Sequence, residues 1–152
     1  MDTDGAVRPY PGRDGSTAAR GSAAAEAQGA SKVTVRAVRG AVQLDRDEAE
    51  HMDERVAELL TAILERNSLT ADDLISVWFT ATPDLHSDFP AAAARKLGIV
   101  DVPLICAQEL DVTGAMPRVV RVLAHVETDR PRAEIQHAFL RGAAALRRDL
   151  PS

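Results

Sequence analysis

The chain has 152 residues, with 18 Lys and Arg against 23 Asp and Glu and a formal net charge of −5 at pH 7. This length fits one domain with a substantial core, and the acidic balance argues against the basic stripe of a nucleic-acid binder. No apolar run is long enough to span a membrane, and the N-terminus lacks the apolar region of a signal peptide. The single cysteine excludes an internal disulfide, which fits a reducing cytoplasm. From these features together we expect a cytoplasmic protein that binds neither nucleic acid nor membrane.

The first part of the chain, residues 1–32, differs sharply in composition from the rest. It lacks Leu, Ile, Phe and Trp, and is rich in Ala, Gly, Ser and Arg. Such a segment buries too little apolar surface to offset the entropy of ordering, so we expect a disordered extension before a domain at 33–152. An alternative is that translation of the native protein begins near Val33 or Val35.

The first elements of the domain alternate between strand and helix patterns. Residues 33–40 predict a strand. Asp45 and Glu48 resemble a capping box at the start of a helix over 46–66. The apolar residues of this helix recur at helical spacing along one stripe: Ala49, Met52, Val56, Leu59, Leu60 and Ile63.

Turn signals separate the next elements. Thr70 and Asp73 predict a capped short turn before a strand at 74–82. Pro83 and Asp84 then break the chain. A short helix is expected at 90–97, ended by Gly98.

Two strands and a helix are predicted in the last third of the chain. The strands cover 102–110 and 119–128, and the helix covers about 132–147. The order strand-helix-strand-helix-strand-strand-helix predicts an α+β fold with a mixed sheet packed against helices. Because 119–128 is apolar on both sides, its sheet needs a layer on each face. Three helices are too few, so we expect a partner subunit to cover the second face.

One segment, residues 106–122, combines Cys106, Glu109 and Arg121. Cys106 lies three positions before Glu109, so in a strand the two face opposite sides and would need a bend to meet. Arg121 lies in an apolar run, where a permanent cation is costly unless it meets a carboxylate or an anionic ligand. We therefore expect a site for a small anion.

Several common catalytic motifs are absent from the sequence. It has no phosphate-binding Gly-rich loop, no paired-cysteine zinc motif and no nucleophile elbow. Asp84, His86 and Asp88 alternate like metal ligands, but on a loop that contains proline we interpret them as turn and cap residues. These features favour a reaction that needs neither a cofactor nor a covalent intermediate.

Four motifs together resemble one enzyme family. They are VRAVRGA at 35–41, TATPDLHSDFP at 80–90, C-x-Q-E-x-D-V-x-G at 106–114 and HAFLRGAAALRRDL at 137–150. With them the chain resembles the monofunctional trimeric chorismate mutases of α/β-barrel-like fold, from Val33 to Leu150. The resemblance implies a homotrimer, with active sites between subunits and no cofactor or metal. It also implies the Claisen rearrangement of chorismate to prephenate, by conformer selection and stabilisation of charge on the ether oxygen.

The resemblance also implies four catalytic residues. Arg121 would donate to the ether oxygen and a substrate carboxylate, and Arg39 would bind the side-chain carboxylate. Glu109 would accept a hydrogen bond from the ring hydroxyl, and Cys106 would line the same pocket. Considered singly, these residues have ordinary alternatives: a structural ion pair, a solvated strand end, a surface acid and a buried inert thiol.

Further positions match substrate-binding residues of that family. They line or cover the pocket and are Phe89, Ala91, Arg95, Leu104, Ile105, Phe139, Leu146 and Arg147. Two positions depart from the family pattern. Phe139 stands where many members have a tyrosine, and Ala92 stands where some have a lysine. Both changes remove groups that would attract a substrate dianion.

Two other functions are compatible with an arginine-lined pocket. One is an imine deaminase-like enzyme on a similar trimeric scaffold, which needs an arginine and an activated water but not Glu109. The other is a non-catalytic trimer that binds a small carboxylate, which Phe139 makes conceivable. Of these three functions, only a chorismate mutase requires turnover of chorismate.

Overall fold

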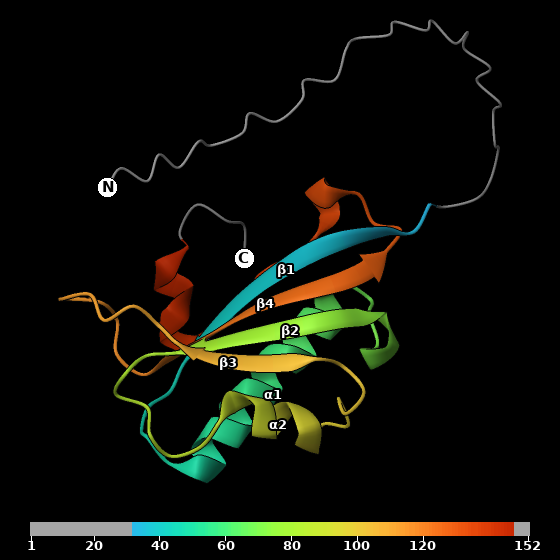
Figure 1. The fold of residues 1–152 in the computed structure, drawn as a ribbon. Coiled ribbons are helices and arrows are strands. Elements are labelled where there is room, and N and C mark those ends of the chain that lie inside the picture. The colour runs from blue at the N-terminus through green and yellow to red at the C-terminus, as the bar shows by residue number, and fades with distance from the viewer. Residues whose placement is uncertain (1–31, 148–152) are drawn as a thin grey trace, which may run out of the picture. The chain divides into compact units, whose positions relative to one another are not determined.

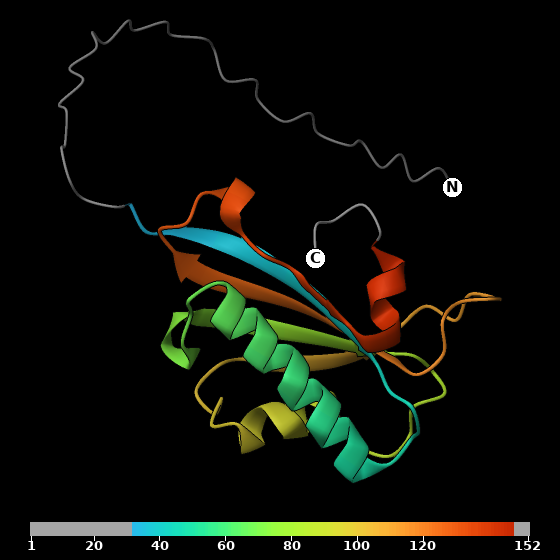
Figure 2. The same ribbon diagram turned by 180° about the vertical axis from the view of Figure 1, so that it is seen from behind.

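The structure, a computed structural model, describes residues 32–147 (Figure 1). The extension expected at residues 1–32 lies outside the described residues, apart from Lys32. A mixed five-stranded sheet, in the order β3-β2-β4-β1-β5, forms the centre of the domain. Two α-helices, α1 and α2, cover one face of this sheet (Figure 2). We call this face the inner face and the opposite one the outer face. The α+β prediction is confirmed.

The strands and helices alternate along the first two thirds of the chain. In chain order they are β1 (Thr34–Gln43), α1 (Ala49–Arg66), β2 (Leu74–Ala81), α2 (Pro90–Lys96), β3 (Leu104–Gln108), β4 (Val119–Thr128) and β5 (Ala138–Leu140). Three short 3-10 helices complete the described chain: η1 (Ala71–Asp73), η2 (Arg132–Glu134) and η3 (Arg141–Leu146).

Antiparallel pairing joins the three central strands. β4 pairs antiparallel with β1 on one side and with β2 on the other. The two edge strands are parallel to their neighbours, β3 to β2 and β5 to β1. None of the helices in the described part of the chain is long and apolar enough to cross a membrane.

The main core lies between the inner face and the two α-helices. Its apolar residues include Val38, Val42, Val56, Leu59, Ile63, Val77, Phe79, Val122 and Val126. Gly40 sets how closely α1 approaches β1, because a Cβ atom there would lie 2.9 Å from Leu59 Cδ1 and 3.0 Å from Ala138 O. A side chain at this position would push the helix away from the sheet.

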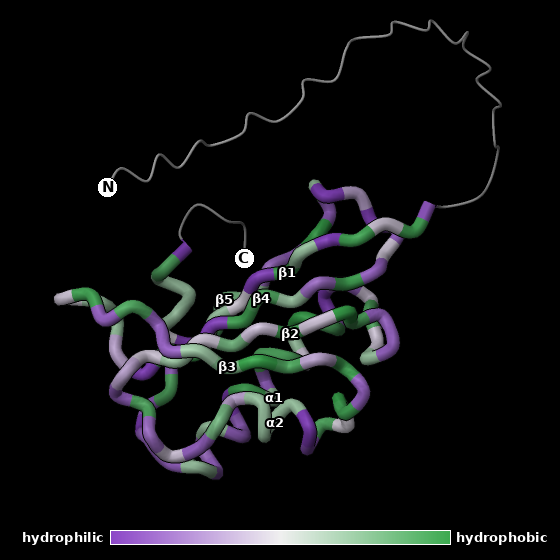
Figure 3. Tube along the Cα trace, in the orientation of Figure 1, coloured by the Kyte–Doolittle hydropathy of each residue, from purple (hydrophilic) through white to green (hydrophobic). Residues whose placement is uncertain are grey.

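The outer face keeps large apolar side chains exposed. Trp78 is 52% exposed, and Val35, Ile105 and Leu123 are also exposed. Figure 3 shows the hydrophobic character of β3 at the sheet edge. An exposed apolar patch of this kind usually marks an interaction surface. The exposure agrees with the expectation that the domain's own helices leave one face uncovered.

The α-helix predicted at 132–147 is wrong. This segment forms η2, β5 and η3 instead. The buried Asn67 side chain donates to Gln136 O and accepts from Gln136 N, both at 2.8 Å, which holds that backbone extended. β5 then pairs with residues 40–42 of β1, and Arg141 adopts a φ of 57°, outside the α-helical region. Tertiary contacts therefore override the apolar spacing that suggested a helix.

Smaller differences concern the ends of elements. α1 begins at Ala49 after an N-cap Glu48 that makes no side-chain cap bond, so the predicted capping box with Asp45 is wrong. The capping box of Thr70 and Asp73 is confirmed at η1. The first strand continues to Gln43, beyond the predicted end at residue 40, because β4 and β5 both supply it with partners.

Candidate active site

Arg39 and Arg121 lie on the outer face of neighbouring strands. In the antiparallel register Arg39 is opposite Leu123, and Arg121 is opposite Ala41. Directly opposed residues share a face, and so do residues two apart on one strand. The two arginines are therefore diagonal neighbours, a relation that places Cα atoms about 7–8 Å apart, within reach of long side chains. The expected arginine pair thus faces one common region.

Glu109 reaches the same region from the end of β3. Its backbone N–H donates to Ala81 O at 2.9 Å, which keeps the chain beside β2 after the strand ends. Thr80, opposite Arg121 in the register, donates its Oγ1 hydrogen to Glu109 Oε2 at 2.5 Å. Arg121 Nε lies 3.4 Å from the same oxygen. Both described contacts involve Oε2, which leaves Oε1 for a ligand.

The Arg121–Glu109 pair is incompletely satisfied. The two side chains are 33% and 27% exposed. Arg121 Nε is buried and has no hydrogen-bond partner among the described residues, because the ion pair is not aligned as a hydrogen bond. A buried unpaired donor costs about 1–3 kcal/mol, and more when it is charged. An anionic ligand that accepts from this guanidinium would remove that cost, which indicates a binding site.

The C-terminal part of the described chain borders the arginines on the outer face. Phe139 is opposite Ala41 on β5, and Leu146 packs in the same small cluster. Arg147 lies over the Phe139 ring, with its guanidinium carbon 5.8 Å from the ring centroid. Phe139, Leu146 and Arg147 therefore lie on the same face as Arg39 and Arg121.

His137 belongs to this neighbourhood and was not predicted. Its Nδ1 accepts a hydrogen bond from the backbone N–H of Arg39 at 3.0 Å. Burial and the positive charges of Arg39 and Arg147 lower the pKa of its imidazole. The two arginine charges that contribute to this shift, after burial, would also attract a dianion. Its position two residues before Phe139 was the only signal in the sequence.

A groove of about 440 Å³ continues from His137 along the free edge of β1. His125 and Arg132 also line it, but neither Arg39 nor Arg121 does. The His125 ring is held by Ser76, with Oγ and Nδ1 3.0 Å apart. This groove is therefore adjacent to the arginine pair and does not contain it.

A second group of predicted residues surrounds α2 and β3. Phe89, just before α2, is 70% exposed, whereas Ala91 is buried and Arg95 is exposed. Leu104 and Cys106 are partly buried against the main core on the inner side of β3. Ile105 points to the outer face, opposite Trp78. A single chain does not bring Cys106 together with Glu109, as strand alternation predicts.

The loop before α2 has the turn contacts expected for Asp84 and Asp88. Asp84 Oδ1 accepts from Thr82 Oγ1 at 2.5 Å, and Asp88 Oδ1 accepts from Phe89 N at 2.7 Å. Asp47 accepts from the backbone N–H groups of His86 and Ser87 at 2.9 and 3.0 Å. Within residues 32–147 no cluster of His, Cys, Asp and Glu is arranged to hold a metal ion. The loop contacts position Phe89 and the start of α2.

Comparison with known proteins supplies the family context. Residues 35–150 match the family model described as chorismate mutase type I. The chain is 45% identical over 119 residues to the chorismate mutase AroH of Thermus thermophilus, covering 78% of this chain and 98% of that protein. It is 41% identical over 117 residues to the chorismate mutase AroH of Bacillus subtilis (strain 168), covering 76% of this chain and 92% of that protein. A solved chorismate mutase from Clostridium thermocellum matches with a TM-score of 0.71 and 39% identity, covering 72% of this chain and 98% of that one.

Proposed function

Since the chain belongs to the chorismate mutase type I family, we propose that it rearranges chorismate to prephenate in a site formed between the subunits of a homotrimer. As a chorismate mutase it is an isomerase. The carbon–oxygen ether bond breaks while a carbon–carbon bond forms, in one concerted step that starts from a folded, chair-like conformer of the substrate. No proton or electron has to leave the substrate, so the protein acts by positioning and by electrostatics.

Arg121 stabilises the charge that develops on the ether oxygen. The observation that carries this assignment is its buried Nε, which is charged and without a hydrogen-bond partner among the described residues. A donor fixed in this way needs little reorganisation when charge grows on the ligand. Its contact with Glu109 and its strand position keep the guanidinium in place before substrate binds.

Arg39 binds a carboxylate of the substrate beside Arg121. Arg147 is the second candidate for this task, because it lies over Phe139 and its charge reaches His137. Phe139 offers no hydroxyl for the same carboxylate. The missing hydrogen bond to a charged group would weaken binding by about 1.5–3 kcal/mol unless water replaces it. We therefore expect a higher KM than a tyrosine at this position would give.

Glu109 accepts the hydrogen bond of the ring hydroxyl. Thr80 and Arg121 already occupy Oε2, so Oε1 is the oxygen that a ligand would meet. The carboxylate thus orients the substrate and also helps to hold Arg121. Its removal should lower kcat/KM through both effects.

The second half of the site comes from a neighbouring subunit. Within one chain the residues near α2 and β3 lie apart from the arginine pair: Phe89, Ala91, Arg95, Leu104, Ile105 and Cys106. β3 is an edge strand, and Phe89 and Trp78 leave large apolar surface uncovered. Packing the outer face against another copy would bury this surface and bring the second group toward a neighbour's arginines.

The test is consumption of chorismate by the purified protein without added cofactor. Chorismate absorbance should fall and prephenate should appear with one-to-one stoichiometry. Unchanged chorismate in the presence of a folded, oligomeric protein would remove the proposed activity. A Glu109→Gln variant that retained full kcat/KM would instead favour a site in which Glu109 does not bind the ring hydroxyl of the substrate.

A further inference from the structure

The chain leaves the plane of the sheet at Arg141 and continues over the outer face. Before this point β5 extends the sheet beside β1. After it, Ala143 and Leu146 of η3 pack on the outer face against Ala41 and Val119. Arg141 has a φ of 57°, a left-handed value that side chains other than glycine seldom adopt. The crossing therefore needs contacts that hold this residue in place.

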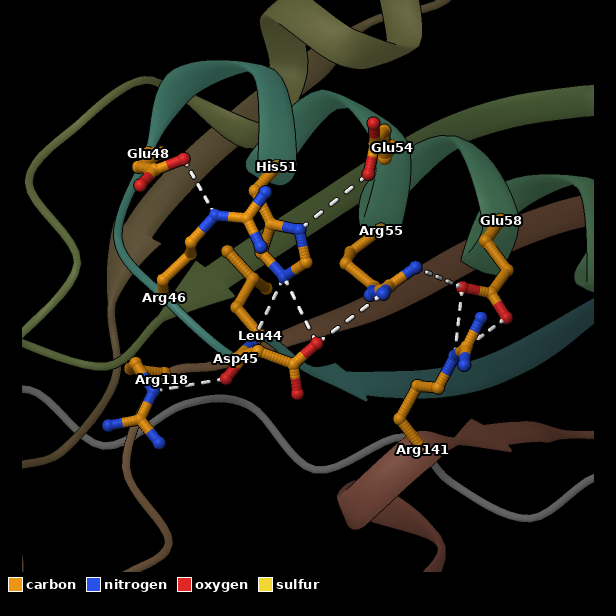
Figure 4. Close-up of polar contacts among 10 residues, drawn as sticks. All are labelled: Leu44, Asp45, Arg46, Glu48, His51, Glu54, Arg55, Glu58, Arg118 and Arg141. Carbon is orange, nitrogen blue, oxygen red and sulfur yellow. Dashed lines mark hydrogen bonds and ion pairs between the residues drawn. The ribbon is translucent and has the colours of Figure 1, made fainter.

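Glu58 of α1 provides such a contact from the inner side. Its Oε1 and Oε2 lie 3.1 and 3.2 Å from Arg141 Nε (Figure 4). Both oxygens of the Glu58 carboxylate accept from the same N–H group of Arg141. This charged contact restrains the Arg141 guanidinium at the edge of the sheet. Glu58 itself belongs to a helix that contributes none of the proposed site residues.

A second cation holds Glu58 in turn. Arg55 NH1 lies 3.2 Å from Glu58 Oε2, and Arg55 NH2 lies 3.4 Å from Asp45 Oδ2. The Arg55 side chain is only 17% exposed. Asp45 also donates its backbone N–H to the buried His51 ring at 3.1 Å. Glu58 is thus part of a network anchored in the fold, which distinguishes it from an isolated surface ion pair.

The restrained segment carries proposed substrate contacts on both sides of Arg141. Phe139 precedes it by two residues, and Leu146 and Arg147 follow it by five and six. We propose that Glu58 is a positioning residue that acts through Arg141 to hold the segment 141–147 over the site. This inference rests on the proposed function, because it requires that segment to contact the substrate.

The test compares Glu58→Gln with the wild-type enzyme. The amide keeps the shape of the side chain but removes its charge. We expect KM for chorismate to rise three- to tenfold while kcat changes less than twofold, because the ether-oxygen donor Arg121 is untouched. The matched control is Glu48→Gln, which removes the exposed ion pair to Arg46 on the same side of the molecule and should leave KM unchanged.

A double-mutant cycle shows whether the effect passes through Arg141. Arg141→Gln should raise KM to a similar extent, and the double variant should be no worse than the more affected single variant. Arg141→Lys, which keeps the charge, should recover part of the loss. High salt should narrow the KM difference between wild type and Glu58→Gln, because Arg141 is 52% exposed and salt screens its attraction to Glu58.

Two results would overturn the inference. One is an unchanged KM in Glu58→Gln, and the other is additive effects of Glu58→Gln and Arg141→Gln. The first result overturns the inference even if the thermal midpoint falls, since lower stability with unchanged KM is the signature of a merely structural pair. Loss of the proposed function gives a different pattern, in which wild-type enzyme and Glu48→Gln both fail to consume chorismate.

Discussion

The two groups of proposed site residues differ in how the fold places them. Arg39, Arg121 and Glu109 converge within one chain, because cross-strand register fixes their relative positions. The residues around α2 and β3 lie beside exposed surface, and β2 separates them from the strands that carry Arg39 and Arg121. In the proposed site, strand pairing therefore preorganises the electrostatic half within one chain, whereas the apolar half would depend on assembly.

The largest expected effect comes from breaking the preorganised half at Arg121. Arg121→Ala should lower kcat about 10²–10³-fold, as expected for loss of one fixed donor to a developing oxyanion. Steady-state kinetics would measure this loss, and Arg121→Lys should recover little, because lysine lacks the planar fork. Activity close to wild type in Arg121→Ala would separate this arginine from the chemistry.

Mixing two impaired variants tests whether the halves belong to different subunits. Arg121→Ala damages one half and Arg95→Ala weakens the other. Refolding them together should restore about one quarter of wild-type activity, because that fraction of sites in a random cyclic oligomer receives two intact halves. The measurement is specific activity after mixing, relative to each variant refolded alone. Sites contained within one chain would show no gain on mixing.

Cys106→Ser sharpens the contrast at β3. The thiol packs on the inner side of the strand, apart from Glu109 within one chain. We expect serine to keep activity within about tenfold, since a wall residue loses at most a weak hydrogen bond and some apolar contact. Kinetics on the folded variant would measure this effect, and complete inactivation would point to a thiolate mechanism.

The smallest expected effect concerns pH and His137. Its pKa is lowered in the folded state, so the unfolded chain binds a proton more readily as pH falls through its ordinary value near 6.5. The stability that His137 contributes is thus present at higher pH and is lost on acidification. Wild type should lose more thermal stability between pH 7 and pH 5 than His137→Gln. Equal losses in melting scans would show that the imidazole does not contribute.

Local patterns predicted most elements but not the last one. Apolar periodicity was sufficient for α1 because its stripe faces the sheet directly. Ile135, Phe139 and Ala143 show the same spacing, but Asn67 binds the backbone of Gln136 and β1 pairs with β5. These partners lie far away in the sequence, so no local rule could reveal the strand.

The site residues were predictable to a similar, partial extent. Arg121 stood out as a cation in an apolar strand, and the structure places it beside Glu109. The roles of Phe89 and Arg95 rest on the family resemblance, since their own environment in one chain is ordinary exposed surface. Glu58 gave no sequence signal and His137 only its position near Phe139, because their proposed roles rest on contacts with Arg141 and Arg39.

Trp78 gives the uncovered sheet face an optical reporter. It is the one tryptophan in the sequence, and it lies on β2 in that face, opposite Leu123 and Ile105. Its emission should shift to shorter wavelength when another subunit excludes water from the indole. Fluorescence during serial dilution would therefore follow dissociation directly, and the same dilution series would show whether turnover disappears with the blue-shifted signal.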